Sequence, residues 1–510
     1  MPKKVTLPAH YVELRKLHRD VATLRSVDDI LNWDQETYMP PAGGAHRAEQ
    51  QAMISAIVHE KRTAGRIGDL LTRCELDKSL TKDEAISANL REMRRDFDRA
   101  TRLPTDLVSE IARTQSLAQE AWKKAREADD FKQFRPWLEK MVGLMRKKAE
   151  CYGVPASGEL YDNLLEEYEP GMTAAQVDAI FTPLRPRLSA LVQELTTAKA
   201  KVSSRVTELK LPVAPQTDFA NAILIAMGFD MQAGRLDVTT HPFCSSPGPL
   251  DTRLTTRYGS ASFLEPLSGT MHEAGHGLYE QGLPKAAHWG EPLGDAVSLG
   301  IHESQSRMWE NFVGRSRGFW QWCTPVAKKT LGPTMKASPE DLFRAANVVK
   351  RSFIRVEADE ATYNLHVMLR FNLERALING DLAVKDLPKA WNAMFKDYLG
   401  LKVPSDKVGC LQDVHWAFGL VGYFPTYTLG NLYAAQFWEK INRDIPDLEK
   451  RMSKGNFGDL LGWLRHNIHR HGRRYRAAEL CRKVTGKELS PEPLMRHLES
   501  KLRAVYGLNV

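Results

Sequence analysis

The sequence has no long apolar run, few cysteines and no low-complexity stretch. None of its hydrophobic segments approaches the roughly 18 residues that a membrane helix needs. The first residues, MPKKVTLPAH, carry no apolar stretch behind their lysines. We therefore expect no membrane span, no secretory signal and a cytoplasmic protein. With 34 glycines and 27 prolines in 510 residues, the collagen-like and low-complexity classes are excluded.

Cysteine pairs are also missing. The six cysteines lie far apart, and no two of them form a Cys-x-x-Cys pair. This spacing is typical of reduced thiols and argues against a disulfide framework.

Basic residues outnumber acidic residues only modestly. Lys and Arg total 71 and Asp and Glu total 63, which leaves a net charge of +8. Arginines are densest between Arg465 and Arg482, where the single acid is Glu479. Such a stretch indicates either a solvated helix face or a nucleic-acid contact. No zinc-finger, RRM or helix-turn-helix signature accompanies it, so we favour the solvated face and expect no nucleic-acid or membrane partner.

Apolar residues recur at helical spacing through most of the chain. From Ile86 to Phe97, for example, they fall on one helix face. The exception is residues 235–262, where strands fit at 236–240 and 252–257, joined by the Ser-Ser-Pro-Gly-Pro segment. No βαβ alternation is visible, which argues against Rossmann and TIM-barrel folds. The sequence predicts a mainly α protein with one small antiparallel sheet.

The first chemical motif is a His-Glu-x-x-His sequence at residues 272–276. On a helix, His272 and His276 project from one face about 5–6 Å apart, as two ligands of one zinc ion require. Glu273 follows the first ligand and would serve as general base. The alternative is a charged helix whose two histidines are hydrogen-bonded within the fold.

A third ligand is expected on a later helix. Glu303 and its neighbour His302 both qualify. We favour Glu303, because two histidines and one glutamate form a catalytic zinc set that leaves a position open for water.

Two later segments combine polar and apolar residues. His415 and Tyr423 could donate hydrogen bonds to an oxyanion, or they could belong to a buried, satisfied network. Arg355 lies among acidic residues in a segment with helical spacing. It is either structural or a bidentate partner for a substrate carboxylate.

Together these motifs resemble the Taq-type metallocarboxypeptidases, the family also called thermostable carboxypeptidase 1. The chain carries every signature of that family in order. The matching segments are HPF (241–243), DxRxT (251–255), HExxH (272–276), HESQ (302–305), IRxxAD (354–359), GxxQDxHW (409–416) and an N-terminal WDQETYMP segment (33–40).

The resemblance implies a large helical peptidase fold similar to neurolysin and angiotensin-converting enzyme, with a deep cleft and an N-terminal lid. It implies one zinc ion per chain, replaceable by cobalt, and homodimers that remove C-terminal residues broadly, with proline disfavoured. The implied metal ligands are His272, His276 and Glu303, with Glu273 as general base and acid. The implied substrate or oxyanion contacts are Arg355, Gln412, His415, Tyr423 and Arg253.

Because the expected ligands and contacts must converge on one cleft, we expect one unit over residues 1–510. Within it, residues 1–150 would form the helical lid and residues 151–510 the catalytic region. A modest positive charge is expected to help attract peptide carboxylates. Two other activities remain open, an oligo-endopeptidase or a dipeptidyl carboxypeptidase on the same scaffold. Outside catalysis, the alternative is a binding protein with an inactive site.

Overall fold

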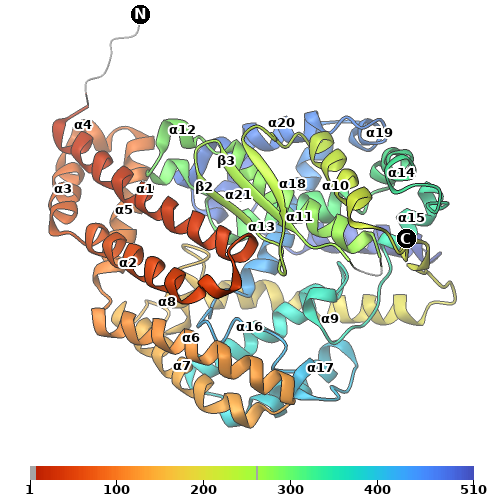
Figure 1. Ribbon diagram of the computed structural model, residues 1–510, viewed down its shortest axis with the longest axis horizontal. Helices are drawn as coiled ribbons and strands as arrows, with labels where there is room; N and C mark the ends of the chain where they lie inside the picture. The colour runs from red at the N-terminus through yellow and green to blue at the C-terminus, as the bar shows by residue number, and fades with distance from the viewer. Residues whose placement is uncertain (1–6, 260–261, 510) are drawn as a thin grey trace, which may run out of the picture.

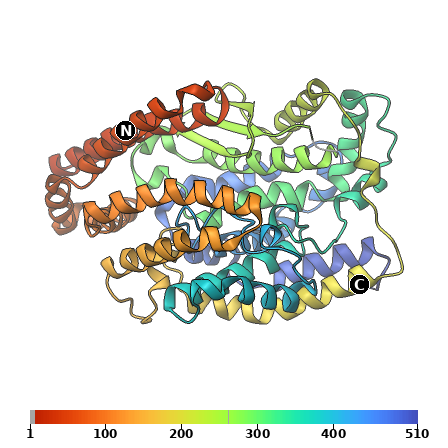
Figure 2. The same ribbon diagram turned by 60° about the horizontal axis from the view of Figure 1, so that its bottom comes forward.

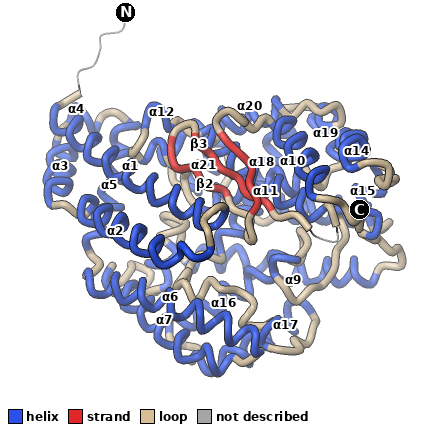
Figure 3. Tube along the Cα trace, in the orientation of Figure 1, coloured by secondary structure: helices blue, strands red, loops and turns tan. Residues whose placement is uncertain are grey.

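The computed structural model describes residues 7–259 and 262–509, and these residues form helices around one small sheet (Figures 1 and 3). The predicted mainly α fold is confirmed. Among the described residues, no helix combines the length and the apolar character that crossing a membrane requires.

The N-terminal helices form a group with its own apolar core. Residues of α1, α3, α4 and α5 make this core, which includes Tyr11, Leu70 and Met93. The second and larger core begins at Leu107 and includes α6 and α7. The bounds are α1 (Ala9–Thr37), α2 (Gly44–Arg62), α3 (Gly65–Leu76), α4 (Lys78–Thr81), α5 (Glu84–Thr101), α6 (Thr105–Ala128) and α7 (Phe131–Cys151).

The middle of the chain carries the sheet and the helices around it. The segments are α8 (Tyr161–Leu165), α9 (Ala174–Thr197), α10 (Val213–Met227), β1 (Gly234–Val238), β2 (Cys244–Gly248), β3 (Asp251–Thr256), α11 (Leu264–Gly282), α12 (Lys285–His288) and α13 (Leu299–Arg307). A π-helical turn over Met308–Val313 continues α13 directly.

The C-terminal part is helical, and its last helix, α22, lies beside α9 (Figure 2). The helices are α14 (Arg317–Leu331), α15 (Pro339–Ala346), α16 (Tyr363–Asn379), α17 (Leu387–Leu399), α18 (Pro425–Asp444), α19 (Leu448–Met452), α20 (Gly458–Asn467), α21 (Ala477–Thr485) and α22 (Glu492–Val505).

The sheet is mixed, so the expectation of a purely antiparallel sheet is wrong. Its order is β1-β3-β2, with β1 parallel and β2 antiparallel to β3. Most of the Ser-Ser-Pro-Gly-Pro segment, expected as a loop, belongs to β2. Pro247 is compatible with this assignment because β2 is an edge strand. The helix α1 packs beside β2 (Figure 1).

The arginine-rich stretch is more than a solvated face. Arg473 is largely buried and donates to Glu92 at 3.0 Å and to Asp96 at 2.9 Å, both on α5. This stretch therefore fastens the N-terminal helices to the rest of the protein.

Candidate metal centre

Two helices bring the predicted ligands together. α11 carries His272 and His276, and α13 carries Glu303. The two Nε2 atoms lie 3.2 Å apart, and Glu303 Oε2 lies 3.7 Å from the first and 3.5 Å from the second. Three donor atoms thus converge within 4.8 Å of one another.

The surroundings of the three residues fit a divalent metal. Each histidine uses its Nδ1 for a partner on the far side of the ring, which leaves both Nε2 atoms directed at Glu303. Burial and the neighbouring His302 lower the pKa of His276 to about 3, so this ring is neutral near pH 7, the form that binds metals. Two imidazoles and one carboxylate are a donor set that zinc accepts.

Close helix packing depends on glycine at two positions. A Cβ atom at Gly275, inside the His-Glu-x-x-His motif, would lie 2.5 Å from the Cα of Ser306 on α13. A Cβ atom at Gly430 on α18 would lie 2.7 Å from the Cβ of Glu303. Both distances are too short for real atoms, so these glycines allow α11 and α18 to approach α13.

Glu310 and Arg307 complete this side of the centre, and sequence reasoning missed both. Glu310 Oε2 lies 2.9 Å from His272 Nδ1. Arg307 donates to Glu303 at 2.6 Å and to Glu310 at 3.0 Å. Glu310 lies in the π-helical turn, and such turns often occur at functional sites. The spacing of Arg307, one helical turn after Glu303, was the available sequence signal.

Glu273 is 7% exposed and lies beside the ligands. Burial, reinforced by the nearby carboxylates Glu303 and Glu310, raises its pKa to about 7. A carboxylate with a pKa near neutral pH can both accept and return a proton.

His302, the alternative third ligand, is turned to other partners. Its Nδ1 is hydrogen-bonded to His276 Nδ1, and its Nε2 lies 2.6 Å from Glu280 Oε1. Both ring nitrogens are therefore occupied, and the converging set contains Glu303 instead.

Arg355 belongs to a buried charge cluster. It is 5% exposed and donates to Asp413 from Nε at 3.2 Å and from Nη2 at 2.9 Å. Arg370 donates to the other oxygen of Asp413 at 2.7 Å. Two guanidinium groups and one carboxylate leave this cluster with one net positive charge.

A tyrosine connects this cluster to the metal centre. Arg355 Nη1 donates to the Tyr363 hydroxyl at 2.9 Å. Arg307 lies over the ring of the same tyrosine, 4.3 Å from its centroid. Tyr363 therefore contacts both the Arg355 cluster and a residue of the candidate metal centre.

Gln412 lies next to Arg355, and its side chain forms hydrogen bonds with the backbone. Its Oε1 accepts from Arg355 N at 2.9 Å, and its Nε2 donates to the carbonyls of Phe353, Val408 and Gly409. This geometry holds the segment that carries Arg355.

His415 and Tyr423 are half-buried, and their rings lie 5.6 Å apart. Burial, together with Arg355 and Arg370, lowers the pKa of His415 to about 4. Its Nδ1 has no hydrogen-bond partner among the described residues. A neutral imidazole of this kind can still donate one N–H to a ligand.

Arg253 faces the N-terminal helices. It makes a bidentate pair with Asp251, with both bonds at 2.8 Å, and lies 4.4 Å from the ring centroid of Trp33 on α1. Trp33 also lines a cavity of about 300 Å³ between α1 and the edge strand β2.

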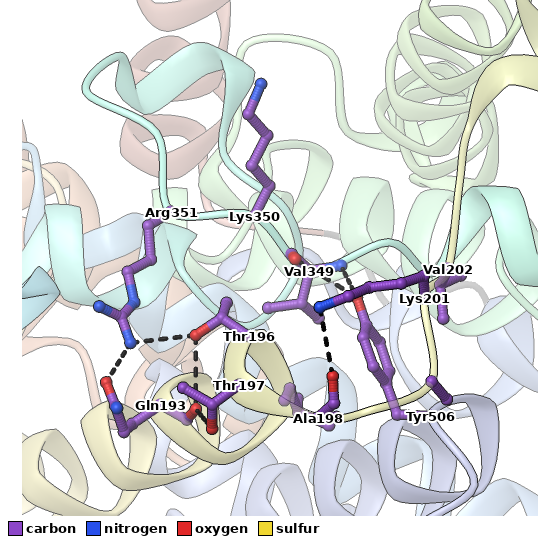
Figure 4. Close-up of a pocket in the computed structure, with 12 residues that line it drawn as sticks. Gln193, Thr196, Thr197, Ala198, Lys201, Val202, Val349, Lys350, Arg351 and Tyr506 are labelled. Atoms are coloured by element: carbon purple, nitrogen blue, oxygen red, sulfur yellow. Dashed lines mark hydrogen bonds between the residues drawn. The ribbon is translucent and has the colours of Figure 1, made fainter.

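A larger cavity of about 440 Å³ shares no residue with the metal centre (Figure 4). Two of its three basic side chains support the end of α9: Lys201 donates to the Ala198 carbonyl and Arg351 to Thr196 Oγ1. These contacts give Lys201 and Arg351 a structural role.

Comparison with known proteins places these residues in a family. A family model described as "Carboxypeptidase Taq (M32) metallopeptidase" matches residues 13–502. Thermostable carboxypeptidase 1 of Thermus thermophilus is 44% identical over 512 residues, which cover 99% of this chain and 100% of that protein. Carboxypeptidase 1 of Bacillus subtilis is 35% identical, with 94% and 95% covered. The crystal structure of an M32 carboxypeptidase from Deinococcus radiodurans superposes with a TM-score of 0.94 at 38% identity, over 98% of this chain and 100% of that one.

Proposed function

Because the chain belongs to the carboxypeptidase Taq (M32) family of metallopeptidases, we propose that it removes single residues from the C-terminus of peptides with one zinc ion per chain. His272, His276 and Glu303 would hold the ion, and cobalt would be able to replace it. A metal ion there supplies Lewis-acid activation of water and of the scissile carbonyl.

Glu273 performs the proton transfers in this proposal. Its carboxylate takes a proton from the attacking water and later delivers it to the leaving amine. The raised pKa supports this role, because the group can hold a proton between the two transfers. A bound cation favours the ionised carboxylate and thereby shifts the acid limb of the activity profile below pH 7.

Arg355 binds the C-terminal carboxylate of the substrate, and the net positive charge of its cluster is the observation that carries the proposal. A guanidinium group has five N–H donors. Two N–H groups of Arg355 donate to Asp413 and one donates to Tyr363. The remaining two can form a bidentate pair with a carboxylate, and its negative charge would neutralise the cluster.

The other predicted contacts take supporting positions. His415 and Tyr423 donate to the oxyanion in this proposal, because both are half-buried side chains that lie beside the Arg355 cluster. Gln412 fixes the backbone of Arg355, and Arg253 holds α1 through Trp33 at the wall of the cleft. We further propose a cytoplasmic homodimer with broad specificity and slow release of C-terminal proline, with residues 1–150 as a lid over a catalytic region of residues 151–510.

The test compares one peptide with a free and with an amidated C-terminus. The metal-loaded enzyme should shorten the free peptide by one residue at a time, and amidation should remove most of the activity. Masses of the products separate the alternatives. Losses of two residues indicate a dipeptidyl carboxypeptidase, and internal fragments indicate an oligo-endopeptidase. Equal cleavage of both peptides would refute the role of Arg355.

A further inference from the structure

The Nδ1 atoms of the two histidine ligands have different kinds of hydrogen-bond partner. His272 Nδ1 contacts the carboxylate of Glu310 directly. His276 Nδ1 instead contacts a second imidazole, Nδ1 of His302, and only then does a carboxylate follow, Glu280 Oε1 at 2.6 Å from His302 Nε2.

The row of contacts continues beyond Glu280 to a buried cation. Lys285 Nζ pairs with the second oxygen of Glu280 and also donates to Ser246 Oγ at 2.7 Å. Ser246 lies on the edge strand β2. All four side chains from His276 to Lys285 are half-buried or buried, so water does not replace these contacts easily.

The chemistry of imidazole fixes which group donates and which accepts in each hydrogen bond of this row. A histidine that binds a metal through Nε2 carries its proton on Nδ1, so His276 must be the donor to His302. His302 then accepts at Nδ1 and keeps its own proton on Nε2, which donates to Glu280. The positive charge of Lys285 keeps Glu280 ionised and therefore an acceptor.

We propose that His302 and Glu280 are positioning residues that fix the tautomer and the orientation of His276 as a metal ligand. Partners of this kind typically raise metal affinity 10–100-fold. The inference rests on the proposed metal binding by His276, and it gives the HESQ histidine a role other than ligation.

The test measures the affinity for zinc by competition with a chelator, which needs no enzyme activity. His302→Phe keeps the aromatic ring, which packs 5.2 Å from the Tyr279 ring, but loses both hydrogen bonds. We expect zinc to bind about 10–100-fold more weakly. His302→Gln can accept with Oε1 and donate with Nε2, so its affinity should stay near that of the wild type.

A second cluster of the same composition provides the matched control. His497 Nε2 lies 3.0 Å from Glu360 Oε1, and Lys501 pairs with the other oxygen of Glu360. His497→Phe and Glu360→Gln remove the same kinds of contact away from the ligands. They should leave the zinc affinity unchanged, whereas Glu280→Gln should lower it by about tenfold.

The outcomes separate the inference from the proposed function. If the wild type binds zinc and His302→Phe binds it equally well, His302 has no positioning role. Equal weakening in His302→Phe and His497→Phe would also overturn the inference, because it would reflect a general loss of stability. If the wild type binds no zinc, the proposed metal site itself is wrong. With cobalt as the metal, the visible spectrum of His302→Gln should match that of the wild type, and a changed spectrum would indicate that His302 is a ligand.

Discussion

Replacing Asp413 by Asn removes the one negative charge from the buried cluster that contains Arg355. In the wild type, Asp413 accepts two hydrogen bonds from Arg355, at 3.2 and 2.9 Å, and a third from Arg370 at 2.7 Å. The substitution raises the net charge of the cluster from one to two positive charges. An amide cannot compensate two guanidinium groups that are almost completely buried.

The expected cost is large for this reason. Removing one partner of a buried ion pair typically costs about 3–5 kcal/mol, so the variant should unfold at clearly lower denaturant concentration at pH 7. Burial alone raises the pKa of Asp413, but Arg355 and Arg370 hold it well below 3.8. A lowered pKa means that this stability is present above pH 3.8 and is lost as the pH falls below it. The difference between wild type and variant should therefore shrink in strong acid.

Activity should change together with stability. Without Asp413, the Arg355 guanidinium loses its fixed orientation, and kcat/KM for peptides with a free C-terminus should fall at least about tenfold. Added acetate should stabilise the variant more than the wild type, because a small carboxylate bound by the two remaining N–H groups of Arg355 offsets the extra positive charge.

The control is an exposed pair of the same type. Glu439 pairs with Arg496 at 2.7 Å, where both side chains are more than a third exposed. Glu439→Gln should cost less than about 1 kcal/mol. If Asp413→Asn costs no more than this control and acetate has no effect, then Asp413 does not compensate the two arginines and the net charge assigned to the cluster is wrong.

Three further predictions concern Glu273, Gly275 and Glu374, a buried carboxylate on α16. Glu273→Gln should retain zinc while the rate of hydrolysis falls by about 10²–10⁴-fold, and an unchanged rate would exclude Glu273 as the base. Burial raises the pKa of Glu374 from 4.5 to about 7, so its ionisation lowers stability as the pH rises from about 4.5 to 7. The wild type loses this stability between pH 4.5 and pH 8, but Glu374→Gln does not. The free energy of unfolding of the variant relative to that of the wild type should therefore increase by up to about 3 kcal/mol between these pH values, as unfolding curves at both would reveal. Gly275→Ala should weaken both thermal stability and zinc binding, because the added methyl group displaces α13; a variant with wild-type melting temperature and zinc affinity would contradict the packing argument.

Much of the fold could be predicted because helical periodicity is local. The apolar face from Ile86 to Phe97 lies within α5, as expected. The sheet was harder: β2 contains Ser-Ser-Pro-Gly, which also suits a turn, and only pairing with β3 makes it a strand. The parallel pairing of β1 with β3 depends on how the chain crosses the sheet, which residue types do not encode.

The sequence by itself determined the candidate metal-binding pair His272 and His276, and it left Glu303 and His302 as alternatives for the third ligand. His272 and His276 are one helical turn apart, so any helix places them on one face, and Glu303 follows on the next long helix. Their chemistry depends on spacing and residue type, and the amino-acid sequence gives both.

Only the tertiary structure decided what the neighbouring polar residues do. His302 contacts His276 and Glu280, Gln412 is engaged by the backbone around Arg355, and Arg253 packs against Trp33. Each of these contacts joins residues that are at least 22 positions apart in the chain. The physical reason is that a buried polar group takes whichever partner the packing brings within hydrogen-bond distance.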